Sequence, residues 1–185
     1  MSLKNTALLL CDLQKQTINN LYYKKSVINN INKLLFMKKY IPQISFCAIS
    51  EFIPNKLGKT DVENVDVENI DLIYEKTTYS MINDLLVKSL DINNINTVIL
   101  TGMETQWCIN RTSEELKNLN YNIYIPIDAI GNNLTHEANK FNIENLKNNG
   151  AFLTTTDAII CKYLFNYDDI ASKKYLEFIN NNRFE

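Results

Sequence analysis

The sequence predicts an α/β fold, a doubly wound three-layer (αβα) sandwich around a mostly parallel six-stranded sheet. Apolar runs without alternation, such as 6–11 and 96–101, are typical of strands that are buried on both faces. Segments with apolar residues at helical spacing alternate with these runs along the chain. No linker rich in Gly, Pro or Ser and no repeat interrupts the pattern, so we expect residues 1–185 to form a single domain.

Each expected strand is an apolar run that ends at a polar residue or a turn. The strands are residues 6–11, 44–49, 70–75, 96–101, 122–127 and 151–153. The first strand is expected to stop at Asp12, and the fourth leads directly into Gly102. The polar stretch 51–69, which contains Pro54 and Gly58, is expected to be a long loop.

Each expected helix has apolar residues three or four positions apart. The helices are residues 26–40, 80–90, 107–119, 135–148, 156–164 and 169–181. Ser26 and Thr156 are expected N-caps, and Pro42 is expected to end the first helix. The residues expected to face inward from the second helix are Met81, Leu85 and Leu86.

Composition excludes several classes of protein. The 19 basic and 21 acidic residues give a net charge of -2, which argues against a broad nucleic-acid-binding surface. No apolar run reaches the roughly 18 residues that span a bilayer, and the N-terminal apolar stretch lacks the flanks of a signal peptide. We therefore expect a cytoplasmic protein that binds neither nucleic acid nor membrane. The four cysteines form no CxxC motif, and a chain of this length needs no disulfides.

Polar residues at the expected strand ends indicate chemistry, because ligands of such sheets bind beyond the carboxyl ends of the strands. Asp12, Glu51 and Lys76 follow three strands, and Cys108 falls near the start of the helix after the fourth. A helix N-terminus and a lysine lower the pKa of a cysteine, and a carboxylate can take the thiol proton. Each residue also has an ordinary interpretation, as a buried thiol, a helix cap or a solvated lysine. The pattern alone leaves both the catalytic and the ordinary interpretation of these residues open.

Five segments carry a resemblance to a known family. They are ALLLCDLQ (7–14), YEKTTYSM (74–81), VILTGMETQWCI (98–109), IDA (127–129) and GAFLTTT (150–156). On these segments the sequence resembles the isochorismatase-like cysteine hydrolase superfamily, and within it the isochorismatase domain-containing proteins. The likeness runs in order along nearly the whole chain.

The resemblance implies a catalytic triad of Asp12, Lys76 and Cys108. It also implies a cis peptide bond between Met103 and Glu104, and an oxyanion hole made by the backbone N–H groups of Glu104 and Cys108. In the implied mechanism Asp12 deprotonates Cys108, the thiolate attacks a carbonyl carbon, and water releases the resulting thioester.

Departures from the family narrow the expected activity. Nicotinamidases of the superfamily hold a metal with an Asp and two His, but the loop 50–55 has no histidine, and the one histidine, His136, falls in an expected helix. We expect no metal and no other cofactor. Isochorismatases that cleave an enol ether lack the cysteine. What remains is a hydrolase of a small amide or ester, and we expect the C–N bond of a non-peptide amide to be cleaved.

Four residues beside the triad positions, Gln14, Phe52, Tyr79 and Trp107, are expected to line a pocket for a small planar substrate. Packing of Phe52 and Trp107 at a subunit contact is the alternative. Because members of the superfamily are usually oligomers, the resemblance also implies a homo-oligomer.

Two other functions compete with the hydrolase. One is a catalytically silent scaffold or interaction protein, although a scaffold need not retain Asp12, Lys76 and Cys108. The other is a thiol redox sensor, in which Cys11 would resolve an oxidised Cys108. Strand alternation turns Cys11 to the face opposite Leu10, which disfavours the sensor.

Overall fold

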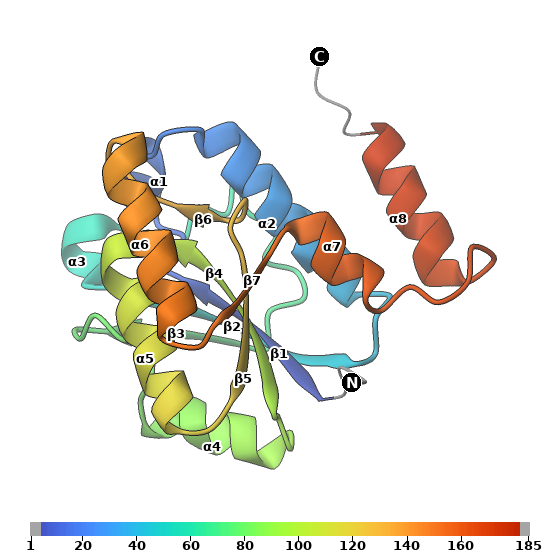
Figure 1. The fold of residues 1–185 in the computed structure, drawn as a ribbon, viewed down its shortest axis with the longest axis horizontal. Helices are drawn as coiled ribbons and strands as arrows, with labels where there is room; N and C mark the ends of the chain where they lie inside the picture. The colour runs from blue at the N-terminus through green and yellow to red at the C-terminus, as the bar shows by residue number, and fades with distance from the viewer. Residues whose placement is uncertain (1–4, 182–185) are drawn as a thin grey trace.

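The computed structural model describes residues 5–181, which form a seven-stranded sheet with helices on both faces (Figure 1). The strands are β1 (Thr6–Cys11), β2 (Ile44–Phe52), β3 (Leu72–Lys76), β4 (Thr97–Met103), β5 (Asn122–Pro126), β6 (Ile130–Gly131) and β7 (Phe152–Thr154). The main path is β3-β2-β1-β4-β5-β7, and short β6 pairs with β4. All of these strand pairs are parallel. The predicted fold class is confirmed, with one short strand more than expected.

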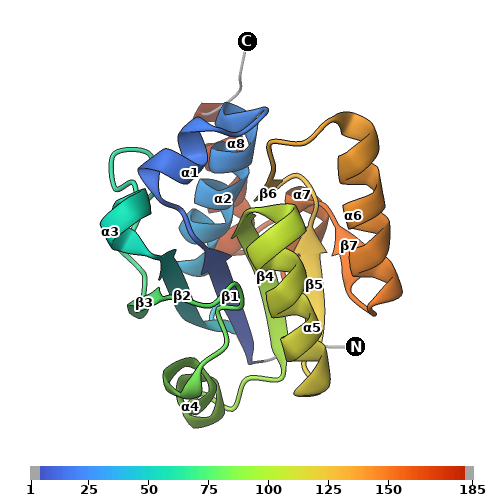
Figure 2. The same cartoon turned by 90° about the vertical axis from the view of Figure 1, so that its left-hand side faces the viewer.

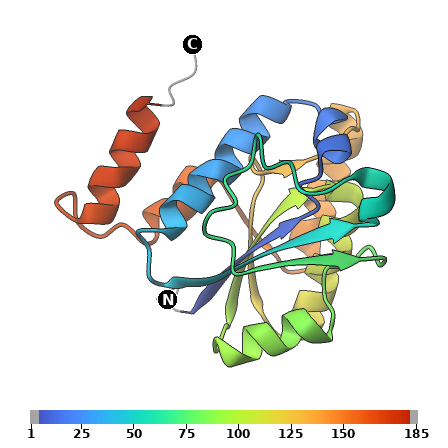
Figure 3. The same cartoon turned by 180° about the vertical axis from the view of Figure 1, so that it is seen from behind.

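The helices form two layers around the sheet. They are α1 (Lys15–Asn19), α2 (Lys24–Lys38), α3 (Pro54–Leu57), α4 (Asp84–Ile92), η1 (Thr105–Ile109), α5 (Asn110–Asn118), α6 (His136–Asn148), α7 (Thr156–Cys161) and α8 (Ile170–Asn181). Helices α2, α7 and α8 cover one face, and α4, α5 and α6 cover the other (Figures 1 and 2). Helix α8 packs beside α2 at one side of the molecule (Figure 3). No helix within residues 5–181 combines the length and apolar character of a membrane span.

The central strands β1 and β4 are buried along their whole length. Alternation divides their side chains between the two faces. Leu8 and Leu10 join the cluster with α2 and α7, whereas Leu9 and Cys11 join the cluster with α4 and α5. This confirms that Cys11 faces away from Leu10, and burial on both faces explains the continuous apolar runs.

The order in which successive strands are added to the sheet reverses at β1, because β2 and β3 lie on one side of β1 and β4 lies on the other. At the carboxyl edge beside this reversal, Asp12 follows β1, Lys76 ends β3 and Met103 ends β4. This is the position where doubly wound sheets bind ligands. The topology therefore brings together the strand ends that the sequence pattern singled out.

Two expected caps are wrong. Helix α2 already begins at Lys24, after Tyr23 in a left-handed conformation, so Ser26 lies inside its first turn. Helix α7 is capped by Thr155, whose Oγ1 accepts a hydrogen bond from the backbone N–H of Ala158. Thr156 donates instead to an Asp128 carboxylate oxygen, from both its N–H and its hydroxyl.

Helix α4 begins later than expected, and this changes which residues it buries. Asn83 caps it, its side-chain oxygen accepting from Leu86 N at 2.8 Å. Met81 is buried ahead of the helix and Leu86 is buried within it, as expected. Leu85 is 50% exposed, because the later start turns it to solvent. The short elements α1, α3 and β6 were not expected, since so few residues show no periodicity.

Candidate active site

Asp12, Lys76 and Cys108 are in mutual contact at the carboxyl edge of the sheet. Lys76 Nζ lies 3.0 Å from Asp12 Oδ2 and 3.3 Å from Cys108 Sγ. It also donates to the carbonyl oxygens of Thr78 at 3.1 Å and Tyr79 at 3.0 Å. All three residues of this cluster are buried. One ammonium group thus joins a carboxylate and a thiol that come from distant parts of the chain.

The backbone around Asp12 explains how its side chain reaches this point. Asp12 has a positive φ of 53°, and Ser50 Oγ donates to Asp12 Oδ1 at 2.8 Å. Gly102, on the neighbouring strand, has a φ of 106° and packs directly against Cys11, where a Cβ atom would lie 2.2 Å from the Cys11 carbonyl oxygen. The absence of a side chain at Gly102 lets β4 approach β1 where the chain turns into the site.

Cys108 lies in the π-helical segment η1, which leads into α5. The backbone N–H groups of Trp107 and Ile109 both donate to the Glu104 carbonyl oxygen, at 3.0 Å and 3.3 Å. The peptide bond between Met103 and Glu104 is cis, as the resemblance implied. The helix was expected to begin at about residue 107, so the extra turn places Cys108 inside the helical segment, beyond its first residues.

Burial raises the pKa of the Cys108 thiol and the Asp12 charge raises it further, while Lys76 lowers it. Burial also raises the pKa of Asp12, against the lowering effects of Lys76 and of hydrogen bonds with Cys108 and Ser50. Burial alone would lower the pKa of Lys76, but Asp12 and the nearby thiols raise it, so Lys76 stays protonated. Burial thus opposes the thiolate form of Cys108 that Lys76 favours.

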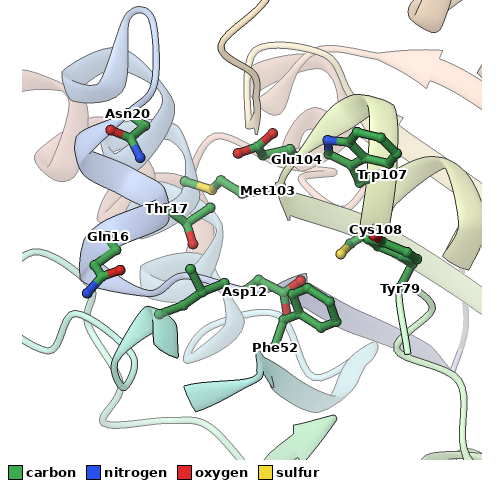
Figure 4. A pocket seen from close by; sticks show the side chains of 11 residues that line it. Asp12, Gln16, Thr17, Asn20, Phe52, Tyr79, Met103, Glu104, Trp107 and Cys108 are labelled. Atoms are coloured by element: carbon green, nitrogen blue, oxygen red, sulfur yellow. The ribbon is translucent and has the colours of Figure 1, made fainter. Parts of the chain in front are cut away.

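A pocket of about 240 Å³ opens beside Cys108 and Asp12 (Figure 4). Phe52, Tyr79 and Trp107 line one side of it. Their rings pack in series, with centroids 5.3 Å apart between Phe52 and Tyr79 and 5.6 Å apart between Tyr79 and Trp107. Three of the four expected substrate-binding residues thus border a cavity next to the thiol.

The Isochorismatase domain family matches residues 6–158. The chain belongs to the isochorismatase-like hydrolase superfamily. It is 30% identical to Isochorismatase domain-containing protein 2 of Danio rerio over 163 residues, which cover 86% of this chain and 79% of the relative.

Two solved structures share this fold. MAR1 ribonuclease from Caenorhabditis elegans superposes with a TM-score of 0.86 at 26% identity, covering 100% of this chain and 94% of that one. The YcaC gene product of Escherichia coli, described as an octameric hydrolase of unknown specificity, gives a TM-score of 0.83 at 16% identity, covering 99% and 90%. The second likeness concerns the fold alone.

Gln14 does not line the pocket of this isochorismatase-like protein, so that expectation is wrong. Its side chain is fully buried, and its Nε2 donates to the carbonyl oxygens of Phe52 at 3.1 Å and Gly58 at 2.5 Å. Its Oε1 accepts from Phe52 N at 2.8 Å. Gln14 therefore holds the backbone that carries an aromatic residue of the pocket.

Sequence reasoning missed several pocket residues, which are Leu57 of α3, Met103 at the end of β4, the side chain of Glu104, and three residues at α1. Gln16, Thr17 and Asn20 face the cavity from and just beyond α1, opposite the aromatic side (Figure 4). Helix α1 spans five residues, too few for a periodic signal. The position of these residues directly after Asp12 is the one signal that pointed toward them.

Glu51, the remaining polar strand-end residue, has a structural role in this isochorismatase-like fold. Its Oε1 accepts from the N–H and the hydroxyl of Thr60, each at 2.8 Å, and its Oε2 pairs with Lys59 at 3.1 Å. Burial would raise the pKa of Glu51, but these bonds lower it below its ordinary value. His136 begins α6 and borders a separate hollow with Tyr22 and Tyr23. Residues 5–181 contain no group of three or more His, Cys, Asp or Glu side chains suited to a metal ion.

Proposed function

We propose that this protein is a metal-independent cysteine hydrolase of a small amide- or ester-type compound, with Asp12, Lys76 and Cys108 as its catalytic residues. The contact of Lys76 Nζ with both Asp12 Oδ2 and Cys108 Sγ, at 3.0 Å and 3.3 Å, carries the proposal. A pocket beside the thiol supports it, because a nucleophile needs room for the reacting carbon.

Asp12 begins the reaction as a general base. The thiol proton of Cys108 passes to Asp12 as the sulfur attacks the substrate carbonyl carbon and a C–S bond forms. The pKa values of both groups are raised by burial, so one proton is shared between neighbouring sites of high proton affinity. Lys76 stabilises whichever of the two is the anion.

The carbonyl oxygen becomes negative in the tetrahedral intermediate. The proposed donors to this oxyanion are the backbone N–H groups of Glu104 and Cys108, and removal of one such donor typically slows catalysis about 100- to 1000-fold. When the intermediate collapses, Asp12 gives its proton to the leaving nitrogen or oxygen and the thioester remains.

Water completes the cycle. Asp12 accepts a proton from water as the water oxygen attacks the thioester, the C–S bond breaks, and the proton returns to the Cys108 sulfur. The products are a carboxylic acid and an amine or alcohol. Because a carboxyl group with a raised pKa can hold the proton that an amine needs, we propose that the bond cleaved is a C–N bond.

Ribonuclease activity, the function in the name of the Caenorhabditis elegans protein, is a second candidate that the pocket does not favour. The pocket side chains include the carboxyl groups of Asp12 and Glu104 and no Lys, Arg or His. Phosphodiester backbones are bound mainly by Lys and Arg. We expect no cleavage of a fluorescent single-stranded RNA, and cleavage that Cys108→Ala abolishes would replace the amide proposal.

Self-association is part of the proposal, since the Escherichia coli protein is described as octameric. Large apolar side chains are exposed in the segment that joins α7 to α8 and at the start of α8. They are Phe165 at 80%, Tyr167 at 73% and Ile170 at 72%. Light scattering after gel filtration should give a mass that is a multiple of 21.5 kDa, and a monomer would contradict this part.

A panel of small amides, ureides and esters tests the hydrolase. Each compound is incubated with wild type, with Cys108→Ala and with Cys161→Ala, the last being a matched control because Cys161 is exposed and lies in α7. Turnover by wild type and Cys161→Ala, but not by Cys108→Ala, is the expected result. Equal turnover by all three would refute the assignment, and turnover of nothing would favour the scaffold.

A further inference from the structure

The pocket has a second polar end, away from the reacting groups. Cys108 and Asp12 form the reactive end (Figure 4). Thr17 and Asn20 lie across the cavity, on the α1 side, and Glu104, between Met103 and Trp107, points its carboxylate toward that side (Figure 4). The proposed mechanism uses the backbone of Glu104 but not its carboxylate, and it does not use Thr17.

Thr17 is 8% exposed and is one of the residues that line the pocket. No hydrogen-bond partner reaches Thr17 Oγ1 within residues 5–181. A buried hydroxyl without a partner carries the free-energy cost of its lost hydration. A ligand that forms a hydrogen bond with the Thr17 hydroxyl would remove this cost. The hydroxyl can therefore take part in recognising a substrate.

The Glu104 carboxylate is the charged group at this end of the pocket. It accepts one hydrogen bond within the described chain, from Gln106 Nε2 to its Oε2 at 2.5 Å. Burial raises the pKa of Glu104 and the Gln106 amide lowers it. An ionised carboxylate accepts hydrogen bonds and donates none, so it recognises N–H and O–H groups.

None of the side chains that line the pocket is a Lys, Arg or His, so none of them offsets the charge of Glu104. Lys76 is paired with Asp12, as described above. Among the cations on the surrounding elements, Lys15 pairs with Glu63, Lys59 with Glu51 and Glu75, and Arg111 with Glu114 and Glu115, whereas Lys24 donates to the amide oxygen of Asn19. A substrate that carries a carboxylate or phosphate would therefore meet like charge without a counter-charge.

We infer that Glu104 and Thr17 are specificity-determining residues, and that the pocket selects a small amide whose far end carries N–H or O–H donors and no negative charge. This inference rests on the proposed function and names its substrate class. The aromatic side formed by Phe52, Tyr79 and Trp107 holds the planar body of the compound, the thiol faces its reactive carbon, and Glu104 binds the donors.

Iodoacetamide and iodoacetate test this selectivity directly. They have nearly the same shape, and each alkylates a thiol at its methylene carbon, where a C–S bond forms, iodide leaves and the thiol proton is released. They differ in the group at the far end, which is a carboxamide in one and a carboxylate in the other. Mass spectrometry of the resulting peptides reports the rate at each cysteine, and exposed Cys161 is the reference inside the same chain.

The iodoacetamide-to-iodoacetate rate ratio at Cys108 should exceed that at Cys161 by about tenfold or more, because a second negative charge beside Glu104 is unfavourable. Glu104→Gln should bring the Cys108 ratio to within about threefold of the Cys161 ratio. The matched control is Glu114→Gln, which removes the same charge from a residue paired with Arg111 outside the pocket and should leave the ratio unchanged. Thr17→Val should slow iodoacetamide labelling of Cys108 but not of Cys161.

Equal ratios at the two cysteines in wild type would overturn the inference, as would equal loss of selectivity in both glutamate variants. These results are separable from the hydrolase test. Charge selectivity without hydrolysis of any amide would refute the proposed function alone, and efficient hydrolysis of carboxylate-bearing amides would refute this inference alone.

Discussion

The side chain of Gln14 forms hydrogen bonds with both the N–H and the carbonyl group of Phe52, as a neighbouring strand would. Gln14 Oε1 accepts from Phe52 N at 2.8 Å, and Gln14 Nε2 donates to Phe52 O at 3.1 Å. This exchange continues the pairing of β2 beyond the end of β1. It fixes the backbone from which the Phe52 ring covers Lys76, with Nζ 4.6 Å from the ring centroid.

Replacing Gln14 by Ala should lower the free energy of unfolding by about 1–3 kcal/mol, because it leaves the polar groups of Phe52 and the Gly58 carbonyl without their buried partner. Urea unfolding followed by circular dichroism measures the loss. Gln16→Ala is the control, since Gln16 is exposed and should change stability by less than about 0.5 kcal/mol. Equal effects of the two substitutions would contradict this account of Gln14.

Gly102→Ala should prevent folding or lower the free energy of unfolding by more than about 4 kcal/mol. The added Cβ would lie 2.2 Å from the Cys11 carbonyl oxygen and 2.6 Å from Cys11 N, and backbone atoms cannot move aside as a side-chain end can. Loss of soluble, cooperatively unfolding protein is the measurement.

Gly58→Ala separates steric clash from backbone strain. Gly58 also has a positive φ, of 80°, but a Cβ there would meet nothing within 4 Å. This variant should fold and lose only about 1–3 kcal/mol, the usual effect of a side chain in that conformation. A Gly102→Ala protein as stable as Gly58→Ala would show that β1 and β4 can separate without loss.

Lys76→Met should destabilise the protein by about 3–5 kcal/mol, since it leaves the buried Asp12 carboxylate without its ion-pair partner. Both side chains of the pair are 3% exposed, so solvent cannot replace the lost partner. The double variant Asp12→Asn/Lys76→Met removes both charges and should be more stable than Lys76→Met alone. Urea unfolding of wild type, Asp12→Asn, Lys76→Met and the double variant gives the coupling free energy, and strictly additive losses would rule out a direct pair.

Native wild type should show no more thiolate absorbance than Cys108→Ala near pH 9.0, the ordinary thiol pKa, because burial raises the pKa of Cys108. After unfolding, wild type should exceed the variant by one titrating thiol. The raised pKa of the folded state means that the stability contributed by the neutral thiol is present below the unfolded pKa and is lost as pH rises toward the folded pKa. An excess of thiolate absorbance in native wild type over Cys108→Ala at neutral pH would contradict the raised pKa of Cys108.

The triad positions could be found from the sequence because the end of a buried strand appears there as the end of an apolar run. The runs that end at Asp12 and before Gly102 are unbroken, since β1 and β4 are buried on both faces. The resemblance then assigned Asp12, Lys76 and Cys108 to one catalytic triad, an assignment that the residue pattern alone left open. The roles of these residues in catalysis stay predictions until the variants are assayed.

Sequence reasoning failed where a residue's role depends on what packs against it from another element. Gln14 follows Asp12 closely, yet its partners Phe52 and Gly58 come from β2 and the loop beyond α3. Leu85 was assigned to the interior because its spacing fits a helix face, but the Asn83 cap starts the helix later and turns it outward.

The order of strands and helices, the parallel sheet and the edge that holds the site were determined by the sequence itself, because periodicity and burial act on neighbours along the chain. Only the tertiary structure decided the raised pKa of Cys108 and the unsatisfied Thr17 hydroxyl at the α1 side of the pocket. Both depend on how much water the surrounding elements exclude, and desolvation is a property of the packed molecule that no local stretch of sequence contains.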